Sequence, residues 1–154
     1  MKVALDTNVL AYAAGVNDVE RRDRANRIMA AMDAVDIVLP SQVAGELFNV
    51  LTRKDRRSRA EAAEVVDEWI QALDLATYTP TTFSAALRLA HEHEFQIWDA
   101  LILCTAAEAG CHLLLSEDMH EGFLYRGVTI ANPFAEQLHP LLASLLEASP
   151  GPNT

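Results

Sequence analysis

The chain has 154 residues, of which 51% are hydrophobic and 22% are charged, and its net charge is −10. This length suits one domain of ~100–150 residues, and the composition excludes a disordered chain. No apolar run approaches the ~20 residues of a membrane-spanning helix, and no secretory signal is visible. We therefore expect a single domain over residues 1–147 and a flexible C-terminal tail over residues 148–154.

Cys104 and Cys111 are the only cysteines, and they form neither a disulfide framework nor a CxxC pair. Reduced thiols and a cytoplasmic protein are therefore expected. The charge is unevenly distributed: residues 1–59 carry ten Lys or Arg against eight acids, and residues 60–154 carry two against fourteen. Nine of the twelve cations fall in the segments 21–27 and 53–59. Each segment alone is typical of a solvated helix end, but together they could form the basic rim of an acidic cleft.

Residues 1–73 predict elements in this order: a strand at 2–5, helices at 8–14 and 20–33, a strand at 36–39, and helices at 41–54 and 58–73. Pro40 stops the second strand, and Ser41 is expected to cap the helix that follows. Ser58 and Glu61 match a capping box, in which each side chain satisfies a free amide group of the first helical turn.

The rest of the chain predicts a weak strand at 75–78, helices at 82–94 and 98–109, a strand at 112–115, an edge strand at 128–130 and a helix at 134–146. Thr82 is expected to cap its helix. Short strands that alternate with helices indicate an α/β fold with a mostly parallel sheet covered on both faces. Ligands of such sheets bind outside the carboxyl ends of the strands.

Acidic residues occupy those strand ends and two unusual helix positions. Asp6 ends the first strand in LDTN, and Glu117 and Asp118 follow the fourth in LLLSED. Glu46 lies on or beside the buried stripe of its helix, where an unpaired charge is costly. Asp99 opens the most apolar helix of the chain.

Each acid alone has a simpler interpretation: an Asx turn for Asp6, an N-cap for Asp99, a solvent-facing or arginine-paired Glu46, and an acidic loop for the pair after the fourth strand. One metal site would explain all of them together. Oxygen ligands without a His or Cys pattern suit Mg²⁺ or Mn²⁺.

Four short segments, LDTNVL, VAGELFNVL, IWDALIL and LLSEDM, resemble in order and spacing the acidic motifs of PIN-domain nucleases. The resemblance covers about residues 2–134, and the size of the chain is most similar to the VapC-type toxins of bacterial toxin–antitoxin pairs. It implies a PIN-like three-layer α/β/α sandwich with a helical hairpin at about 41–73. It also implies that Asp6, Glu46, Asp99 and Asp118 are catalytic metal ligands, and that Asn8 and Ser116 support the site. Glu117 is an additional acid, so either member of the adjacent pair could face the metal.

The resemblance further implies a Mg²⁺- or Mn²⁺-dependent endoribonuclease with one or two ions, an RNA substrate, a small antitoxin partner and a homodimer. A carboxylate cluster repels itself unless cations neutralise it. Arginines of the two basic segments could hold the phosphates that flank the cut. The candidates are Arg22, Arg27, Arg53, Arg56 and Arg57.

Two other functions are compatible with the sequence. One is a phosphatase or phosphotransferase with Asp6 as its nucleophile, although that chemistry usually needs a second aspartate two residues on, where this chain has Asn8. The other is a PIN fold that only binds a partner and has lost its activity. The presence of all four acids argues against such a loss.

Overall fold

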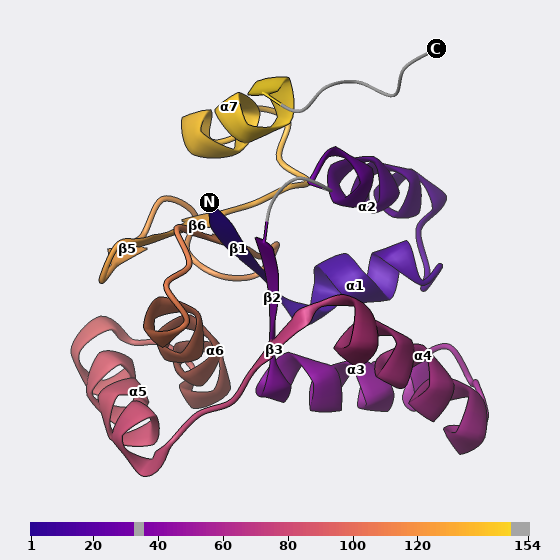
Figure 1. Cartoon of the computed structure of the whole chain (residues 1–154), viewed down its shortest axis with the longest axis horizontal. Helices are drawn as coiled ribbons and strands as arrows, with labels where there is room; N and C mark the ends of the chain where they lie inside the picture. Colours follow the sequence, from indigo (N-terminus) through magenta and orange to yellow (C-terminus); the bar gives the residue numbers. More distant parts are fainter. Residues whose placement is uncertain (33–35, 149–154) are drawn as a thin grey trace.

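A central sheet with helices on both sides forms the framework of the computed structural model, which describes residues 1–32 and 36–148 (Figure 1). Within these residues the sheet has six strands in the order β3-β2-β1-β4-β6-β5. Every neighbouring pair is parallel except β5 and β6. The strands are β1 Lys2–Leu5, β2 Asp36–Pro40, β3 Asp74–Ala76, β4 Leu113–Leu115, β5 Leu124–Tyr125 and β6 Val128–Ala131.

The helices form the outer layers of this sandwich. In Figure 1, α1 to α4 lie to the right of the strands and α5 and α6 lie to the left. Their bounds are α1 Thr7–Ala13, α2 Val19–Ala31, α3 Ser41–Arg53, α4 Arg59–Ala72, α5 Pro80–His93, α6 Ile97–Glu108 and α7 Pro140–Ala148. The expected α/β fold with a mostly parallel sheet is confirmed. None of the described helices is long and apolar enough to cross a membrane.

Burial follows the apolar pattern of the sequence. All of β4 and every residue of α6 from Ala100 to Ala106 are buried, so α6 is the most enclosed helix of the sandwich. In α3 the buried face consists of Val43, Ala44, Leu47 and Leu51. These side chains belong to one hydrophobic core, which holds the carboxyl ends of β1 and β4 and the starts of α3 and α6 in fixed relative positions.

The structure confirms one of the three predicted helix N-caps and places the other two at different residues. Ser58 does cap α4, since its hydroxyl accepts a hydrogen bond from the amide of Glu61. Ser41, however, is the first residue of α3, and the N-cap position belongs to Pro40. Thr82 is the third residue of α5, where it forms a reciprocal capping box with the true N-cap, Thr79. Pro80 at the first helical position favours this earlier start.

The region after β4 differs most from the sequence expectation. The segment 128–130 is not an edge strand, because β6 lies between β4 and β5 and all four of its residues are buried. The edge is β5, a two-residue strand that the sequence did not predict, joined to β6 through Arg126 and Gly127, both with positive φ. Such a two-residue turn matches the twist of a tight hairpin.

The last helix also starts later than expected. Residues 134–139 are not helical: the amide of Phe134 donates to the side chain of Asn132, which forms a local turn, and α7 begins only at Pro140. The weak strand expected at 75–78 lies at 74–76 as β3. Asp33, the expected end of the second helix, and residues 149–154 of the expected tail lie outside the described residues.

Candidate active site

Asp6 lies where two parallel strands end side by side. Leu5 of β1 pairs with Leu115 of β4, and the backbone amide of Asp6 donates to the Leu115 carbonyl at 2.9 Å. Ser116, the next residue after β4, donates its hydroxyl to Asp6 Oδ2 at 2.7 Å. Asp6 Oδ1 accepts the amide of Thr7, also at 2.7 Å. The carboxyl ends of β1 and β4 therefore fix this carboxylate in one orientation.

Burial makes the Asp6 carboxylate a costly charge. Only 5% of the residue is exposed. Burial raises the pKa of Asp6, the hydrogen bonds from Ser116 and Thr7 oppose this effect, and the charges of Glu46 and Asp118 add to it. The influence of these two acids places them in the same electrostatic environment as Asp6.

Glu46 reaches the same place from α3. Its helix starts directly after β2, the other neighbour of β1, and the buried residues Val43 and Leu47 hold the Glu46 side of the helix against the core. Thr7 donates its hydroxyl to Glu46 Oε2 at 2.7 Å, and Gln42 donates its amide to Glu46 Oε1 at 3.1 Å. Sequence reasoning missed Thr7, because nothing in the local pattern shows which hydroxyl lies next to an acid from another helix.

The structure also distinguishes the two acids that follow Ser116. Asn8 donates its side-chain amide to Asp118, and the charge of Asp118 contributes to the raised pKa values of Asp6 and Asp99. Glu117 instead forms an ion pair with Arg21. Its Oε1 accepts a hydrogen bond from Arg21 Nε at 2.9 Å and lies 2.8 Å from a terminal guanidinium nitrogen. Asp118 is thus the member of the pair that shares the environment of the other acids, and Arg21 is a second residue that the sequence did not single out.

Asp99 completes the acidic group from α6. It is not the N-cap: Gln96 holds that position, and its side chain accepts the amide of Asp99 at 3.0 Å. Burial raises the pKa of Asp99 to about 6, with further contributions from the charges of Asp6, Glu46 and Asp118 and a small opposing effect of His120. Four carboxylates from separate parts of the sequence therefore repel one another at one end of the sheet.

The donor chemistry of this group fits a hard divalent cation. All four side chains offer carboxylate oxygens. Burial and the charges of the neighbouring acids raise the pKa of Asp6 and of Asp99, and a cation would relieve the repulsion among these charges. Yet no set of three His, Cys, Asp or Glu side chains within residues 1–32 and 36–148 has the geometry of a metal site. Three of the carboxylates accept hydrogen bonds from neutral donors instead: Asp6 from Ser116, Glu46 from Thr7 and Asp118 from Asn8. The chemistry of the four acids fits the ion, while their ligand geometry is not assembled.

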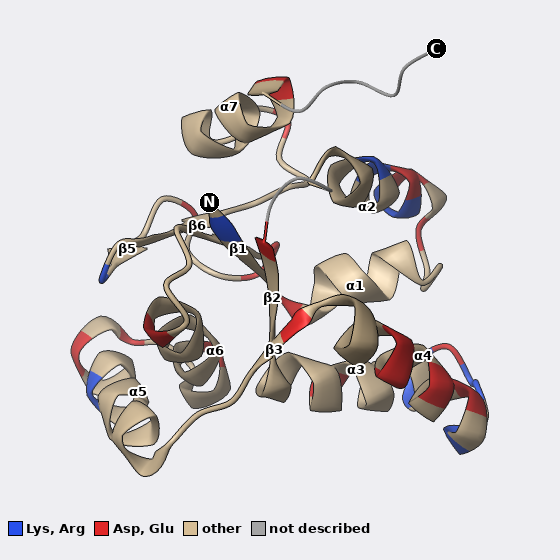
Figure 2. Cartoon of the chain, in the orientation of Figure 1, with Lys and Arg blue, Asp and Glu red and all other residues tan. Residues whose placement is uncertain are grey.

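The arginines of the two basic segments lie on α2 and around the α3–α4 turn (Figure 2). Several already have partners. Arg57 binds Asp55 at 2.5 Å and the carbonyl of Ala14 at 2.7 Å, so it ties the turn to α1. Arg22 contacts Asp23 at 3.2 Å, and Arg27 donates to the backbone of the same residue. Arg53 and Arg56 have exposed side chains.

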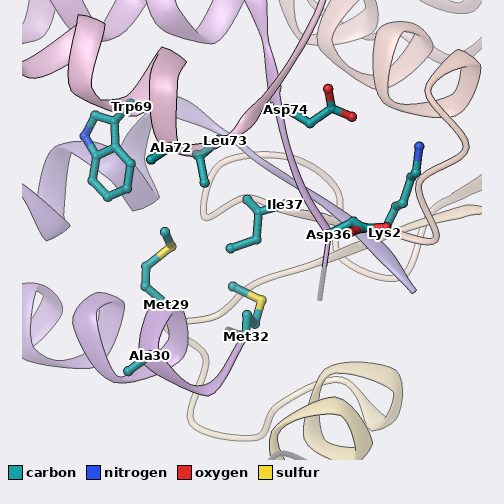
Figure 3. Close-up of a pocket in the computed structure, with 10 residues that line it drawn as sticks. All are labelled: Lys2, Met29, Ala30, Met32, Asp36, Ile37, Trp69, Ala72, Leu73 and Asp74. Atoms are coloured by element: carbon teal, nitrogen blue, oxygen red, sulfur yellow. The ribbon is translucent and has the colours of Figure 1, made fainter. Parts of the chain in front are cut away.

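A hollow of about 710 Å³ lies at the end of the sheet opposite to the four acids (Figure 3). Figure 3 shows Trp69 and two methionines on one side of it and Lys2, Asp36 and Asp74 on the other. The last three residues occur at the amino ends of β1, β2 and β3. None of the acids expected to bind metal lines this hollow, so the candidate site is the acidic end of the sheet.

A family model of the PIN domain matches residues 3–121. The chain belongs to the PIN domain family. The matched range contains all four clustered acids, and the family expected from the sequence is confirmed. Comparison with curated protein sequences finds no match.

Solved structures of similar fold include VapC toxins. Mycobacterium tuberculosis VapC20, described as a sarcin–ricin loop cleaving toxin, is 19% identical, with a TM-score of 0.60 over 73% of this PIN-domain chain and 86% of its own. Rickettsia felis VapBC2, bound to a DNA fragment from its promoter, is 18% identical with a TM-score of 0.62. A toxin–antitoxin complex from Klebsiella pneumoniae is 15% identical with a TM-score of 0.61. The last two matches each cover 86% of this chain and 98% of the other. At these identities the comparisons establish the shared fold.

Proposed function

We propose that this PIN-domain protein is a Mg²⁺- or Mn²⁺-dependent endoribonuclease that acts in the cytoplasm as the toxin of a toxin–antitoxin pair. The observation that carries the proposal is the grouping of four acids at the carboxyl end of the sheet, where Ser116 holds Asp6, Thr7 holds Glu46 and Asn8 holds Asp118, and where Asp99 adds its charge from α6. Membership of the PIN family and the VapC-like fold support it.

In this proposal Asp6, Glu46, Asp99 and Asp118 hold one or two divalent ions. When bound, such ions would supply Lewis acidity toward a phosphodiester and would lower the pKa of a bound water molecule. The chain's own residues orient the ligands: Ser116 fixes Asp6, Thr7 and Gln42 fix Glu46, and Asn8 fixes Asp118. Arg21 holds Glu117 in an ion pair of its own.

RNA would approach from the solvent side of the acidic end. Arg53 and Arg56, which are exposed near the α3–α4 turn, are the better placed of the five candidate arginines to hold phosphates. Arg22, Arg27 and Arg57 would first have to give up contacts within the chain. The phosphatase alternative is less favoured, because that chemistry usually needs a second aspartate two residues after the nucleophile, where this chain has Asn8.

The partner in this role is a small antitoxin, and we further propose a homodimer. Two of the similar folds occur in solved toxin–antitoxin assemblies. An acidic end without its ions would attract a cationic side chain of such a partner, because a guanidinium binds carboxylates in a bidentate manner. Excess Mn²⁺ should then weaken inhibition by the antitoxin.

The test is RNA cleavage by the purified full chain with Mn²⁺, Mg²⁺ or EDTA. Cleavage should require the ion, and Asp6→Asn should reduce it to background. Asp36→Asn is the matched control, because Asp36 is an exposed aspartate at the opposite end of the sheet. Cleavage that persists in EDTA, or in Asp6→Asn, would contradict the proposal.

A further inference from the structure

A second hollow, of about 310 Å³, lies directly beside Glu46 on the solvent side of α3. Its lining is mostly polar and comes from one face of α3 and from the loop after β3. The lining residues are Ser41, Gln42, Gly45, Glu46, Asn49 and Tyr78. Since Glu46 lines the hollow and also belongs to the acidic group, a ligand seated here would lie next to the proposed cleavage site.

The hollow offers the groups that recognise a nucleobase. Asn49 and Gln42 carry side-chain amides with both donors and an acceptor. Gln42 donates one N–H to Glu46 and keeps its oxygen and its second N–H for a ligand. Gly45 leaves the wall open, since a Cβ at this position would have no heavy atom within 4 Å. Tyr78 is 42% exposed, so part of its ring is available for stacking. Bases of single-stranded RNA bind by such stacking together with hydrogen bonds to their edges.

A series of neighbouring aromatic rings leads from this hollow to the start of α6, the helix that carries Asp99. Tyr78 lies 6.3 Å from Phe83, and Phe83 lies 6.2 Å from Trp98, measured between ring centroids. Trp98 is 42% exposed and directly precedes Asp99 in the chain. One exposed ring, Tyr78, thus lines the hollow together with Glu46, and the other, Trp98, lies in the first turn of α6, the helix that carries Asp99. Exposed aromatic side chains along a path are the usual stacking platform for unpaired bases.

We propose that the hollow binds one unpaired nucleobase of the RNA substrate, stacked on Tyr78 with its edge toward Gln42 and Asn49, and that Trp98 stacks a second base. The inference rests on the proposed ribonuclease function and assigns the contacts with two unpaired bases to these side chains. Stacking explains how a chain with a net charge of −10 could hold RNA near four carboxylates, because it needs no cation.

The same exposed rings could instead pack against a second copy of the chain. The lining of the hollow favours a base, because an interface core is depleted of polar groups, whereas here the lining side chains other than Tyr78 are a hydroxyl, two amides and a carboxylate. A bound base and a second copy of the chain can be distinguished, because the first predicts a change in RNA affinity and the second a change in oligomeric state.

The experiment measures binding of fluorescein-labelled 12-nucleotide homopolymers of A, C, G and U by fluorescence anisotropy, in EDTA so that no cleavage occurs. Tyr78→Ala should weaken binding of at least one homopolymer by ~10- to 100-fold, the range for loss of one stacked base. Tyr78→Phe should bind like the unchanged chain, because it keeps the ring. A fully paired RNA duplex should show no difference between the two variants.

Leu124→Ala is the matched control, because Leu124 is an exposed apolar residue on β5 at the other edge of the sheet, 65% exposed. It should leave RNA binding unchanged. Asn49→Ala should alter the preference among the four homopolymers, which a purely structural role for Asn49 would not do. Circular dichroism establishes that each variant is folded.

Unchanged homopolymer binding in folded Tyr78→Ala would overturn the proposal. So would a fall of Tyr78→Ala from dimer to monomer in light scattering with unaltered RNA affinity, which would assign the rings to a chain–chain interface. The ribonuclease proposal is tested separately, because the binding measurement uses neither metal nor cleavage. That proposal fails if the unchanged chain shows no metal-dependent cleavage.

Discussion

The two ends of the sheet carry similar residue types in opposite environments. At the amino ends of the strands, Asp36 and Asp74 are exposed and border a hollow that is otherwise largely apolar. At the carboxyl ends, Asp6 is buried and Asp99 half-buried, and both have raised pKa values. A fold gains nothing from burying like charges together. This difference supports our proposal that the acidic end binds a cation that compensates these charges.

The largest expected effect is on RNA cleavage, which should be lost by a substitution at the acidic end of the sheet and unaffected by one at the amino end. Asp99→Asn keeps the size of the side chain but removes one ligand charge, so metal-dependent RNA cleavage should fall to background. Asp74→Asn, at the opposite end, should retain full activity. Initial cleavage rates in saturating Mn²⁺ provide the measurement. Equal rates in the two variants would mean that the acidic end has no special role.

The residues that orient the acids should give a smaller loss. Thr7→Val removes the hydroxyl that donates to Glu46 but keeps the shape of the side chain. We expect activity or Mn²⁺ affinity to fall ~10- to 100-fold, as for other partners of metal ligands. Thr52→Val is the control, since Thr52 Oγ1 donates only to the backbone of its own helix, at Phe48 and Asn49. An unaffected Mn²⁺ titration and rate for Thr7→Val would remove Thr7 from the site.

A third contrast concerns stability without metal. Burial in the folded chain raises the pKa of Asp99 from its ordinary value of 3.8 to about 6, so the folded chain binds this proton more tightly than the unfolded chain does. The resulting stabilisation is present at low pH and is lost as pH rises through about 6. In EDTA, Asp99→Asn should therefore melt a few degrees above the unchanged chain at about pH 8. The difference should vanish at about pH 4.

Asp36→Asn is again the comparison for these melting curves, because an exposed carboxylate at the amino end should contribute little at either pH. If Asp99→Asn were destabilised at about pH 8, the Asp99 carboxylate would be a structural partner in the fold and not a source of repulsion.

The smallest effect is expected from the basic rim. Arg53→Gln and Arg56→Gln each remove one exposed cation near the α3–α4 turn. If these side chains contact phosphates, each change should lower the slope of log affinity against log salt by roughly 0.7 for single-stranded RNA. Arg57→Gln should instead lower thermal stability, because Arg57 binds Asp55 and the carbonyl of Ala14. Unchanged salt slopes for Arg53 and Arg56 would exclude a phosphate contact by either.

Much of the acidic end could be predicted, because strand ends and helix faces follow from local apolar patterns. Asp6 and Asp118 follow buried strands, and Glu46 interrupts the apolar stripe of α3, so each position was visible in the sequence. The partners of these acids were not visible. Thr7 and Arg21 contact Glu46 and Glu117 only because separate elements pack together, and the partners are 39 and 96 positions apart in the sequence.

The end of the chain was harder to predict for a different reason. β5 has only two residues, and one of them, Leu124, is exposed, so neither length nor alternation distinguishes it from a loop. Its hairpin turn depends on positive φ at Arg126, which the residue type does not suggest. The expected helix at 134–146 continued an apolar pattern across residues that form an Asx turn at Asn132, while Pro140 is favoured at a helix start.

Binding of Mn²⁺ to the metal-free full chain, followed by electron paramagnetic resonance, tests the central claim most directly. One or two Mn²⁺ ions should bind saturably, since carboxylate oxygens suit this ion. Binding should be lost in Asp99→Asn and retained in Asp36→Asn. No saturable binding, or equal binding in the two variants, would contradict the claim that the acidic end of the sheet is a metal site.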